Sequence, residues 1–124
     1  MKINENVKIG DKNTTFKDLI DCKDYTSQCA FVNCSLQSGK ILKMGRLAII
    51  QIAIMPTVTS DWISFCRVPT NLYPVGTSTG GIPLRDNDWI YGSEATGREG
   101  YIQGPIESGK IKNIVGIYLC ENSD

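Results

Sequence analysis

The segment from Leu47 to Met55 is apolar at every position except Gln51. A half-exposed strand alternates apolar and polar side chains, whereas this segment, as a strand, places apolar side chains on both faces. Both faces must therefore be covered. We expect the domain's own core to cover one face and a second copy of the chain to cover the other. We place this oligomer interface at Ile50, Gln51, Ile52 and Ile54.

Length and charge limit the classes of function. The chain has 124 residues, enough for one domain with its own core. Its 13 basic and 13 acidic side chains balance, which argues against nucleic acid as a partner because phosphate binding favours a basic excess. Histidine is absent, so the commonest general base and metal ligand are missing. We predict no enzymatic activity, no cofactor and no metal site.

The cysteines indicate a reducing environment. No Cys-x-x-Cys motif occurs, and the N-terminus does not resemble a signal peptide. The longest apolar run is too short to span a bilayer, so we expect no membrane insertion. We predict synthesis in the bacterial cytoplasm and reduced, partly buried thiols that pack as small apolar residues, at Cys22, Cys29, Cys34, Cys66 and Cys120.

The rest of the pattern predicts strands and turns. Residues 1–27 are polar and are expected to form an N-terminal connector or arm, and residues 28–124 the folded domain. Turn signals recur about every ten residues, and no amphipathic helix of useful length is evident. We predict an all-β fold, an antiparallel β-sandwich of jelly-roll-like type with seven or eight short strands. The expected strands lie at residues 30–36, 40–44, 46–55, 62–68, 88–91, 101–103, 110–112 and 114–120.

Two prolines predict a rigid corner after the 62–68 strand. Pro69 and Pro74 each favour extended geometry in the preceding residue and interrupt strand pairing. We expect this corner to link the two sheets, with Leu72 and Tyr73 inserted into the core between them.

The order of these motifs resembles a known family. An apolar strand follows Lys-x-Gly-Arg, then come Trp-Ile-x-Phe, a Val-Pro…Tyr-Pro pair, a late Gly-Lys-Ile hairpin and a closing strand with Ile-Tyr-Leu. This arrangement is similar to the C-terminal, receptor-binding β-sandwich domain of bacteriophage tail fibre and baseplate proteins, with Val68 in place of the family's usual Leu. The similarity spans about residues 38–120, at Lys43, Gly45, Arg46, Trp62, Ile63, Val68, Pro69, Leu72, Tyr73, Pro74, Gly109, Lys110, Ile111, Tyr118 and Leu119.

The resemblance implies a function in host attachment. It implies a homotrimer packed around a three-fold axis at the tail tip of a virion, with other phage tail proteins as neighbours. It also implies non-covalent binding of a host cell-surface saccharide. The alternative is a stand-alone carbohydrate-binding module, or the accessory domain of a glycan-acting enzyme.

A saccharide site is predicted within residues 85–91. A sugar site combines a flat aromatic face with side chains that hydrogen-bond to neighbouring hydroxyls. Trp89 or Tyr91 would supply the face, and Trp62 is a further aromatic candidate. The polar partners would be Arg85, Asp86, Asn87 and Asp88. The alternative is an ordinary hairpin turn at Asp-Asn-Asp, with Trp89 in the core.

Two other acidic sets favour ordinary surface structure. Glu94 and Glu99 have the composition of a glycosidase pair, but their Gly-flanked loop favours solvated side chains. Asp86 and Asp88 lack the further oxygen ligands of a calcium loop.

Overall fold

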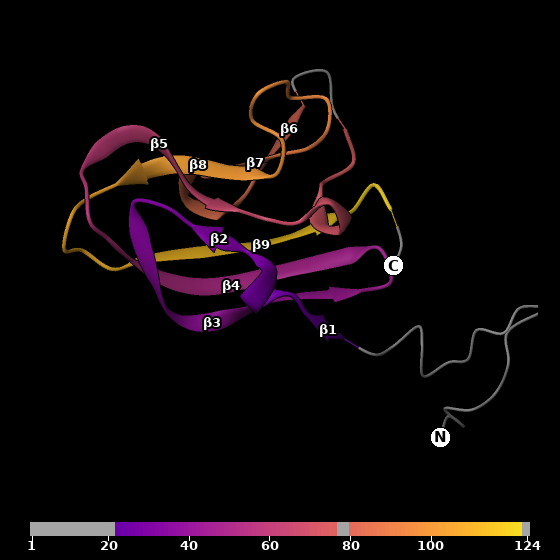
Figure 1. Cartoon of the computed structure of the whole chain (residues 1–124), viewed down its shortest axis with the longest axis horizontal. Helices are drawn as coiled ribbons and strands as arrows, with labels where there is room; N and C mark the ends of the chain where they lie inside the picture. Colours follow the sequence, from indigo (N-terminus) through magenta and orange to yellow (C-terminus); the bar gives the residue numbers. More distant parts are fainter. Residues whose placement is uncertain (1–21, 77–79, 123–124) are drawn as a thin grey trace, which may run out of the picture.

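The computed structural model describes residues 22–76 and 80–122, which form two antiparallel sheets packed face to face (Figure 1). One sheet contains, in spatial order, β1 (Lys23–Asp24), β3 (Cys34–Met44), β4 (Leu47–Pro56) and β9 (Lys112–Leu119). The other contains β2 (Ala30–Phe31), β5 (Ser60–Arg67), β8 (Tyr101–Ile106), β7 (Trp89–Tyr91) and β6 (Gly81–Pro83). The predicted all-β sandwich is confirmed, with nine strands in the described residues. Its jelly-roll-like character stays a prediction.

The helical elements of the described residues are short 3-10 turns. These are η1 (Thr26–Gln28), η2 (Thr70–Leu72) and η3 (Arg85–Asn87). Their shortness agrees with the missing helical periodicity of the sequence. No helix within residues 22–76 and 80–122 has the length and apolar character needed to cross a bilayer.

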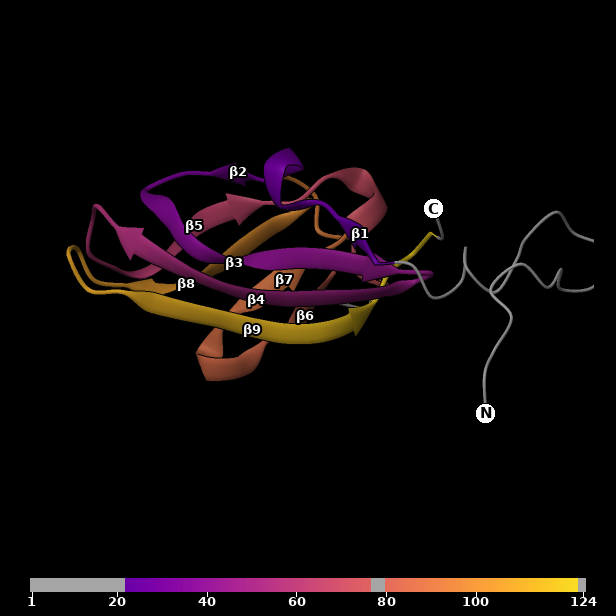
Figure 2. The same cartoon turned by 90° about the horizontal axis from the view of Figure 1, so that it is seen from below.

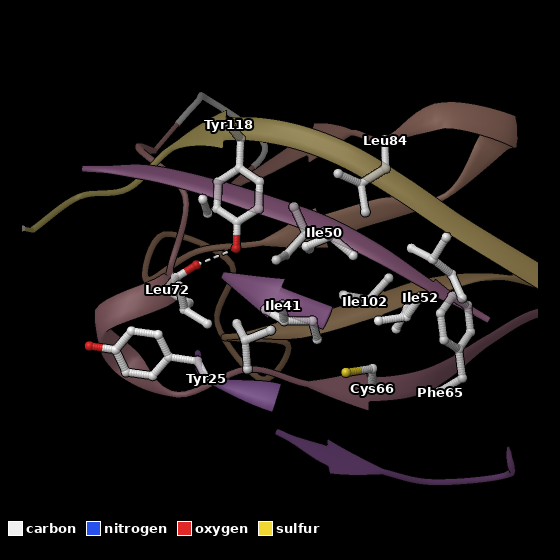
Figure 3. Packing of buried hydrophobic residues seen from close by; sticks show 14 of the residues in the cluster. Tyr25, Ile41, Ile50, Ile52, Phe65, Cys66, Leu72, Leu84, Ile102 and Tyr118 are labelled. Atoms are coloured by element: carbon white, nitrogen blue, oxygen red, sulfur yellow. Dashed lines mark hydrogen bonds between the residues drawn. The ribbon is translucent and has the colours of Figure 1, made fainter. Parts of the chain in front are cut away.

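Strand β4 lies in the middle of the four-stranded sheet, between β3 and β9. Its even-numbered side chains point into the sandwich, where Ile50, Ile52 and Ile54 are at most 3% exposed. They pack with residues of the facing sheet (Figure 3), including Phe65, Cys66, Ile90 and Ile102. Burial of an isoleucine contributes about 1.5–3 kcal/mol relative to exposure. This face of β4 therefore forms the core of a single chain.

The burial corrects the expected oligomer interface. Ile50, Ile52 and Ile54 are covered within one chain, so their side chains are not available to a second copy. Gln51 alone of the four expected interface residues is on the outer face, where it is exposed. A contact of β4 with another chain must therefore use the odd-numbered side of this strand.

The predicted strand over residues 30–36 is two strands in different sheets. Asn33 has a φ of 59°, a left-handed conformation that redirects the chain between β2 and β3. The break expected between the 30–36 and 40–44 strands is instead a bulge inside the continuous strand β3, where the pairing with β4 shifts between Leu36 and Ser38. Gly39 has a φ of 97°, and a Cβ there would clash with the backbone of Gln51.

The sandwich begins before residue 28, where we placed its boundary. Lys23 and Asp24 pair with Lys43 and Leu42 of β3, and Tyr25 is buried in the core. Residues 1–21 of the predicted connector lie outside the described residues.

The proline corner packs as predicted at Leu72. This side chain is fully buried, and its carbonyl accepts a hydrogen bond of 2.7 Å from the Tyr118 hydroxyl (Figure 3). Tyr73 is half-buried against the core. The corner does not join the two sheets along the chain, because it connects β5 to β6 of the same sheet. It contacts the other sheet through a bridge between Pro74 and Cys120.

Candidate functional site

The structure separates the side chains of residues 85–91 that we expected to act together. Asp88 is fully buried, and its Oδ1 atom lies 2.8 Å from the Nζ atom of Lys112. Burial raises the pKa of Asp88 to about 6, against the opposite effect of the Lys112 ammonium group. Asp88 thus faces the interior of the sandwich, and the prediction that it contacts a ligand is wrong.

Tyr91 is also unsuited to stack on a sugar. It is only 6% exposed, and the guanidinium group of Arg98 lies 4.3 Å from the centre of its ring. One ring face is thus already occupied. The prediction that Tyr91 offers a free aromatic face is wrong.

Turn η3 carries the exposed part of the predicted cluster. Arg85, Asp86 and Asn87 are all exposed, and Arg85 Nε lies 3.4 Å from Asp86 Oδ2. Asp86 and Asn87 have φ values of 61° and 69°, which agrees with the turn that we considered as the alternative. Residues of this turn contact β9 of the four-stranded sheet. They are therefore not the partners of Trp89.

Trp89 has a different polar neighbour. On β7, Trp89 lies directly opposite Gln103 of β8, and directly opposed side chains share one face of a sheet. Ile102 and Gly104, the neighbours of Gln103, are buried, whereas Gln103 is half-buried. Trp89 is also half-buried. Both side chains therefore lie on the outer face of the five-stranded sheet, away from the core.

Trp62 lies on the other side of the same glutamine. Its side chain is 41% exposed, and its indole Nε1 donates a hydrogen bond of 3.0 Å to Gln103 Oε1. Gln103 Nε2 in turn donates a hydrogen bond of 2.9 Å to Ser64 Oγ. These two bonds fix the amide of Gln103 and the orientation of the Trp62 ring. The structure thus brings together the two predicted tryptophans across β5, β8 and β7.

Tyr101 and Arg67 extend this face by one more row. They are paired residues of β8 and β5, and the Arg67 guanidinium group lies 5.0 Å from the centre of the Tyr101 ring. Such a contact holds an arginine side chain flat against a ring. We call the six residues together the aromatic surface: Trp62, Ser64, Arg67, Trp89, Gln103 and Tyr101.

The aromatic surface has the chemistry of a saccharide site. Indole rings offer an apolar face to the C–H face of a pyranose, and amide, hydroxyl and guanidinium groups hydrogen-bond to hydroxyls. Neighbouring strands lie about 4.8 Å apart, so β5 and β7 are about 10 Å apart across β8. Trp62 and Trp89 therefore suit contacts with different rings of an oligosaccharide.

Sequence reasoning missed Arg67, and it also missed Gln103, Ser64 and Tyr101. Their signal is the alternation in Trp62-Ile-Ser64 and Tyr101-Ile-Gln103, where every second residue is polar or aromatic and the residue between is apolar. The alternation assigns each side chain to a face. It does not show that β5 and β8 are neighbours.

Glu94 and Glu99, the other acidic pair that we considered, lie on the loop between β7 and β8. Glu94 is exposed, and Glu99 is half-buried with its Oε1 atom accepting a hydrogen bond from the Arg98 backbone. Among residues 22–76 and 80–122, no three His, Cys, Asp or Glu side chains are grouped so as to hold a metal ion.

Comparison with known proteins adds no family to this description. The chain matches no protein-family model, no curated protein and no solved structure.

Proposed function

We propose that this chain is a phage tail-tip domain that binds a host cell-surface saccharide non-covalently through the aromatic surface. The observation that carries the proposal is the row formed by Trp62, Gln103 and Trp89, in which a fixed amide lies between two tryptophans. The motif order of residues 38–120 supports the assignment to a phage tail. The domain acts by binding, without catalysis.

Preorganisation supports binding at this surface. The Gln103 amide is held by Trp62 and Ser64, so its ordering costs little when a sugar arrives. A flat and partly exposed site of this kind binds weakly, and several copies on one particle strengthen attachment by raising the effective concentration of the remaining sites.

An exposed apolar area supports assembly into the homotrimer that we proposed from the family resemblance. On the outer face of the four-stranded sheet (Figure 2), Ile117 and Leu119 are 66% and 51% exposed. The strand register places Ile117 beside Ile49 and Leu42, and Leu119 beside Leu47 and Met44. We call these residues the apolar patch: Leu42, Met44, Leu47, Ile49, Ile117 and Leu119. Contiguous exposed apolar area of this kind marks interaction sites.

The alternative is a stand-alone carbohydrate-binding module. It is favoured by the fact that every residue of the aromatic surface comes from one chain, so binding needs no second subunit. Light scattering after size exclusion separates the two: a trimer has three times the 13.7 kDa mass of the chain, and a module is a monomer.

Tryptophan fluorescence tests binding directly. Trp62 and Trp89 are the only two tryptophans of the chain, and both belong to the aromatic surface. Titration with a panel of bacterial surface oligosaccharides is expected to shift the emission. Trp62→Ala and Trp89→Ala should each weaken binding about tenfold or more, as removal of a stacking ring does. Ile111→Ala, an exposed change on another loop, should not.

The expected losses must occur in folded variants. The melting temperatures of Trp62→Ala and Trp89→Ala should stay close to that of the unchanged protein, because these side chains lie outside the core. If oligosaccharides bind and neither tryptophan substitution weakens the affinity, the aromatic surface is not the site. If no oligosaccharide binds, the proposed function is wrong.

A further inference from the structure

We propose that a groove on the opposite side of the sandwich is a second binding site, specific for an acidic carbohydrate chain that carries carboxylate or phosphate groups. The groove lies on the outer face of the four-stranded sheet and has a volume of about 590 Å³. Leu42 and Ile49 belong both to its lining and to the apolar patch, so a ligand in the groove and a second chain on the patch compete for these two residues. Its polar lining consists of Ser38 and Lys40 on β3, Gln51 on β4, Asn113 on β9 and Arg85 on η3.

The bulge of β3 contributes to the shape of this groove. Gly39 has no side chain, and its positive φ sets Ser38 and Lys40 apart from the regular pleat. Ala53, which lies opposite Ser38 on β4, is small. A shallow floor of Ala53 and Val115 results, with longer polar side chains around it.

The charge of the lining favours an anion. Lys40 and Arg85 are the charged residues that line the groove, and no Asp or Glu lines it. Each cation has one aspartate beside it, Asp24 at 3.2 Å from Lys40 and Asp86 at 3.4 Å from Arg85, but neither aspartate lines the groove itself. A groove lined by one sign of charge concentrates ligands of the opposite sign.

The ion pair of Lys40 leaves its ammonium group free to bind a ligand. Lys40 Nζ lies 3.2 Å from Asp24 Oδ2, with both side chains well exposed. The pKa of Asp24 is lowered to about 2, first by hydrogen bonds from the side chain and backbone of Thr26 and then by Lys40. The two hydrogen bonds from Thr26 are therefore the larger contribution to holding the Asp24 carboxylate, and Lys40 is the smaller one. Exposed pairs of this kind are weak, so a ligand anion can replace Asp24.

Arg85 has the same freedom on the other side of the groove. Its contact with Asp86 uses Nε at 3.4 Å, and both side chains are more than half exposed. A guanidinium group has further N–H donors in a planar fork that suits carboxylate and phosphate oxygens.

The spacing of the two cations indicates a chain instead of a single sugar. Lys40 is on β3 and Arg85 lies next to β9, with β4 between them, so they are about 10 Å or more apart across the sheet. One carboxylate cannot reach both. Anionic groups on different sugars can, while Gln51 and Asn113 hydrogen-bond to the hydroxyls between them.

Calorimetric titration of the full chain with oligogalacturonate and with a glycerol phosphate oligomer tests the site. We expect at least one of them to bind, with an affinity that falls between 50 and 500 mM salt, as screened ionic contacts require. Lys40→Gln and Arg85→Gln should each weaken binding about tenfold, the loss of one charge-assisted contact. The matched control Lys110→Gln removes an exposed lysine outside the groove and should leave the affinity unchanged.

The two probes show which anion the groove prefers, and the other outcomes overturn the proposal. If a neutral oligosaccharide bound the groove as tightly as the acidic probes do, recognition of charge would be ruled out. A single-stranded oligonucleotide with equal affinity would exclude specificity for carbohydrate. Binding that survives both groove substitutions, or no binding of either probe, would remove the site. Trp62→Ala keeps full binding of the acidic probe if the groove is independent of the aromatic surface.

Discussion

Lys112 Nζ and Asp88 Oδ1 are 2.8 Å apart inside the sandwich, and the pair connects its two sheets. Lys112 begins β9 of the four-stranded sheet, and Asp88 directly precedes β7 of the other. Lys112 also donates a hydrogen bond to the Pro105 carbonyl at 2.7 Å, whereas Asp88 Oδ2 has no hydrogen-bond partner among the described residues. Contacts within the protein thus replace only part of the hydrogen bonds to water that the Asp88 carboxylate loses on folding.

This pair predicts an unusual dependence of stability on pH. The pKa of Asp88 is raised from 3.8 to about 6, so between these values the folded state holds a proton that the unfolded state has lost. The contribution of Asp88 to the free energy of unfolding therefore falls as the pH rises from about 4 to 6, by roughly 3 kcal/mol. Urea unfolding across pH 3.5–7 measures this change.

The control for that experiment is Asp88→Asn, which cannot titrate. It should flatten the dependence in this pH window. At pH 7 it should be no less stable than the unchanged protein, because the neutral amide, like the protonated carboxyl group, avoids the cost of burying a negative charge that raises the pKa of Asp88. An unchanged slope in the Asn variant would show that other carboxyl groups cause the effect.

Alanine substitutions at Gly39 and Gly45 should lower the free energy of unfolding by different amounts. Gly39→Ala should lower the free energy of unfolding by more than about 2 kcal/mol, because the positive φ and a clash with the Gln51 backbone act together. Gly45→Ala, with a φ of 62° and nothing within 4 Å of a new Cβ, should cost only about 1 kcal/mol. Chemical denaturation compares them. Equal costs would mean that the bulge relaxes to accept a side chain.

Substitutions on the two faces of the four-stranded sheet, at Ile117 on β9 and Ile50 on β4, should affect assembly and stability separately. Ile117→Lys, in the apolar patch, should convert the proposed trimer to a monomer with little change in melting temperature. Ile50→Ala, in the core, should lower stability by about 2–5 kcal/mol. Light scattering and thermal unfolding separate these outcomes. A monomeric unchanged protein would remove the role of the patch in self-assembly.

The different pKa shifts of Cys29 and Cys34 predict that their thiols react with an alkylating reagent at different rates. A hydrogen bond from Cys66 lowers the pKa of Cys29, whereas burial raises the pKa of Cys34 to about 11. Because the thiolate is the nucleophile, iodoacetamide at pH 8 should modify Cys29 before Cys34. Mass spectrometry of digested protein at successive times gives both rates. Cys66→Ala should slow the reaction of Cys29 and leave that of Cys34 nearly unchanged.

The fold could be predicted from the sequence because it depends on local patterns. Alternating residues, prolines and turn signals predicted most strands and the burial of Leu72. The bulge at Gly39 and the short strand β6 were missed, because glycine and proline in these segments are equally typical of loops. The predicted interface at Ile50, Ile52 and Ile54 was wrong because periodicity identifies two faces of a strand without showing which one the domain covers.

The candidate site was predicted only in part. Trp62 and Trp89 were singled out as aromatic residues, but their shared neighbour Gln103 depends on the order of β5, β8 and β7 in the sheet. That order is set by long-range pairing. Asp88 was misassigned because its partner, Lys112, lies in the other sheet and nothing in the local sequence indicates the pair.

The positions of the aromatic surface and the apolar patch on opposite outer faces have a consequence for attachment. In a trimer that is joined through the patches, the three aromatic surfaces point away from the axis and away from one another. They cannot all lie on one flat membrane at the same time. Such a particle gains most from a target that surrounds its tip, such as a layer of long surface polymers that it enters from above.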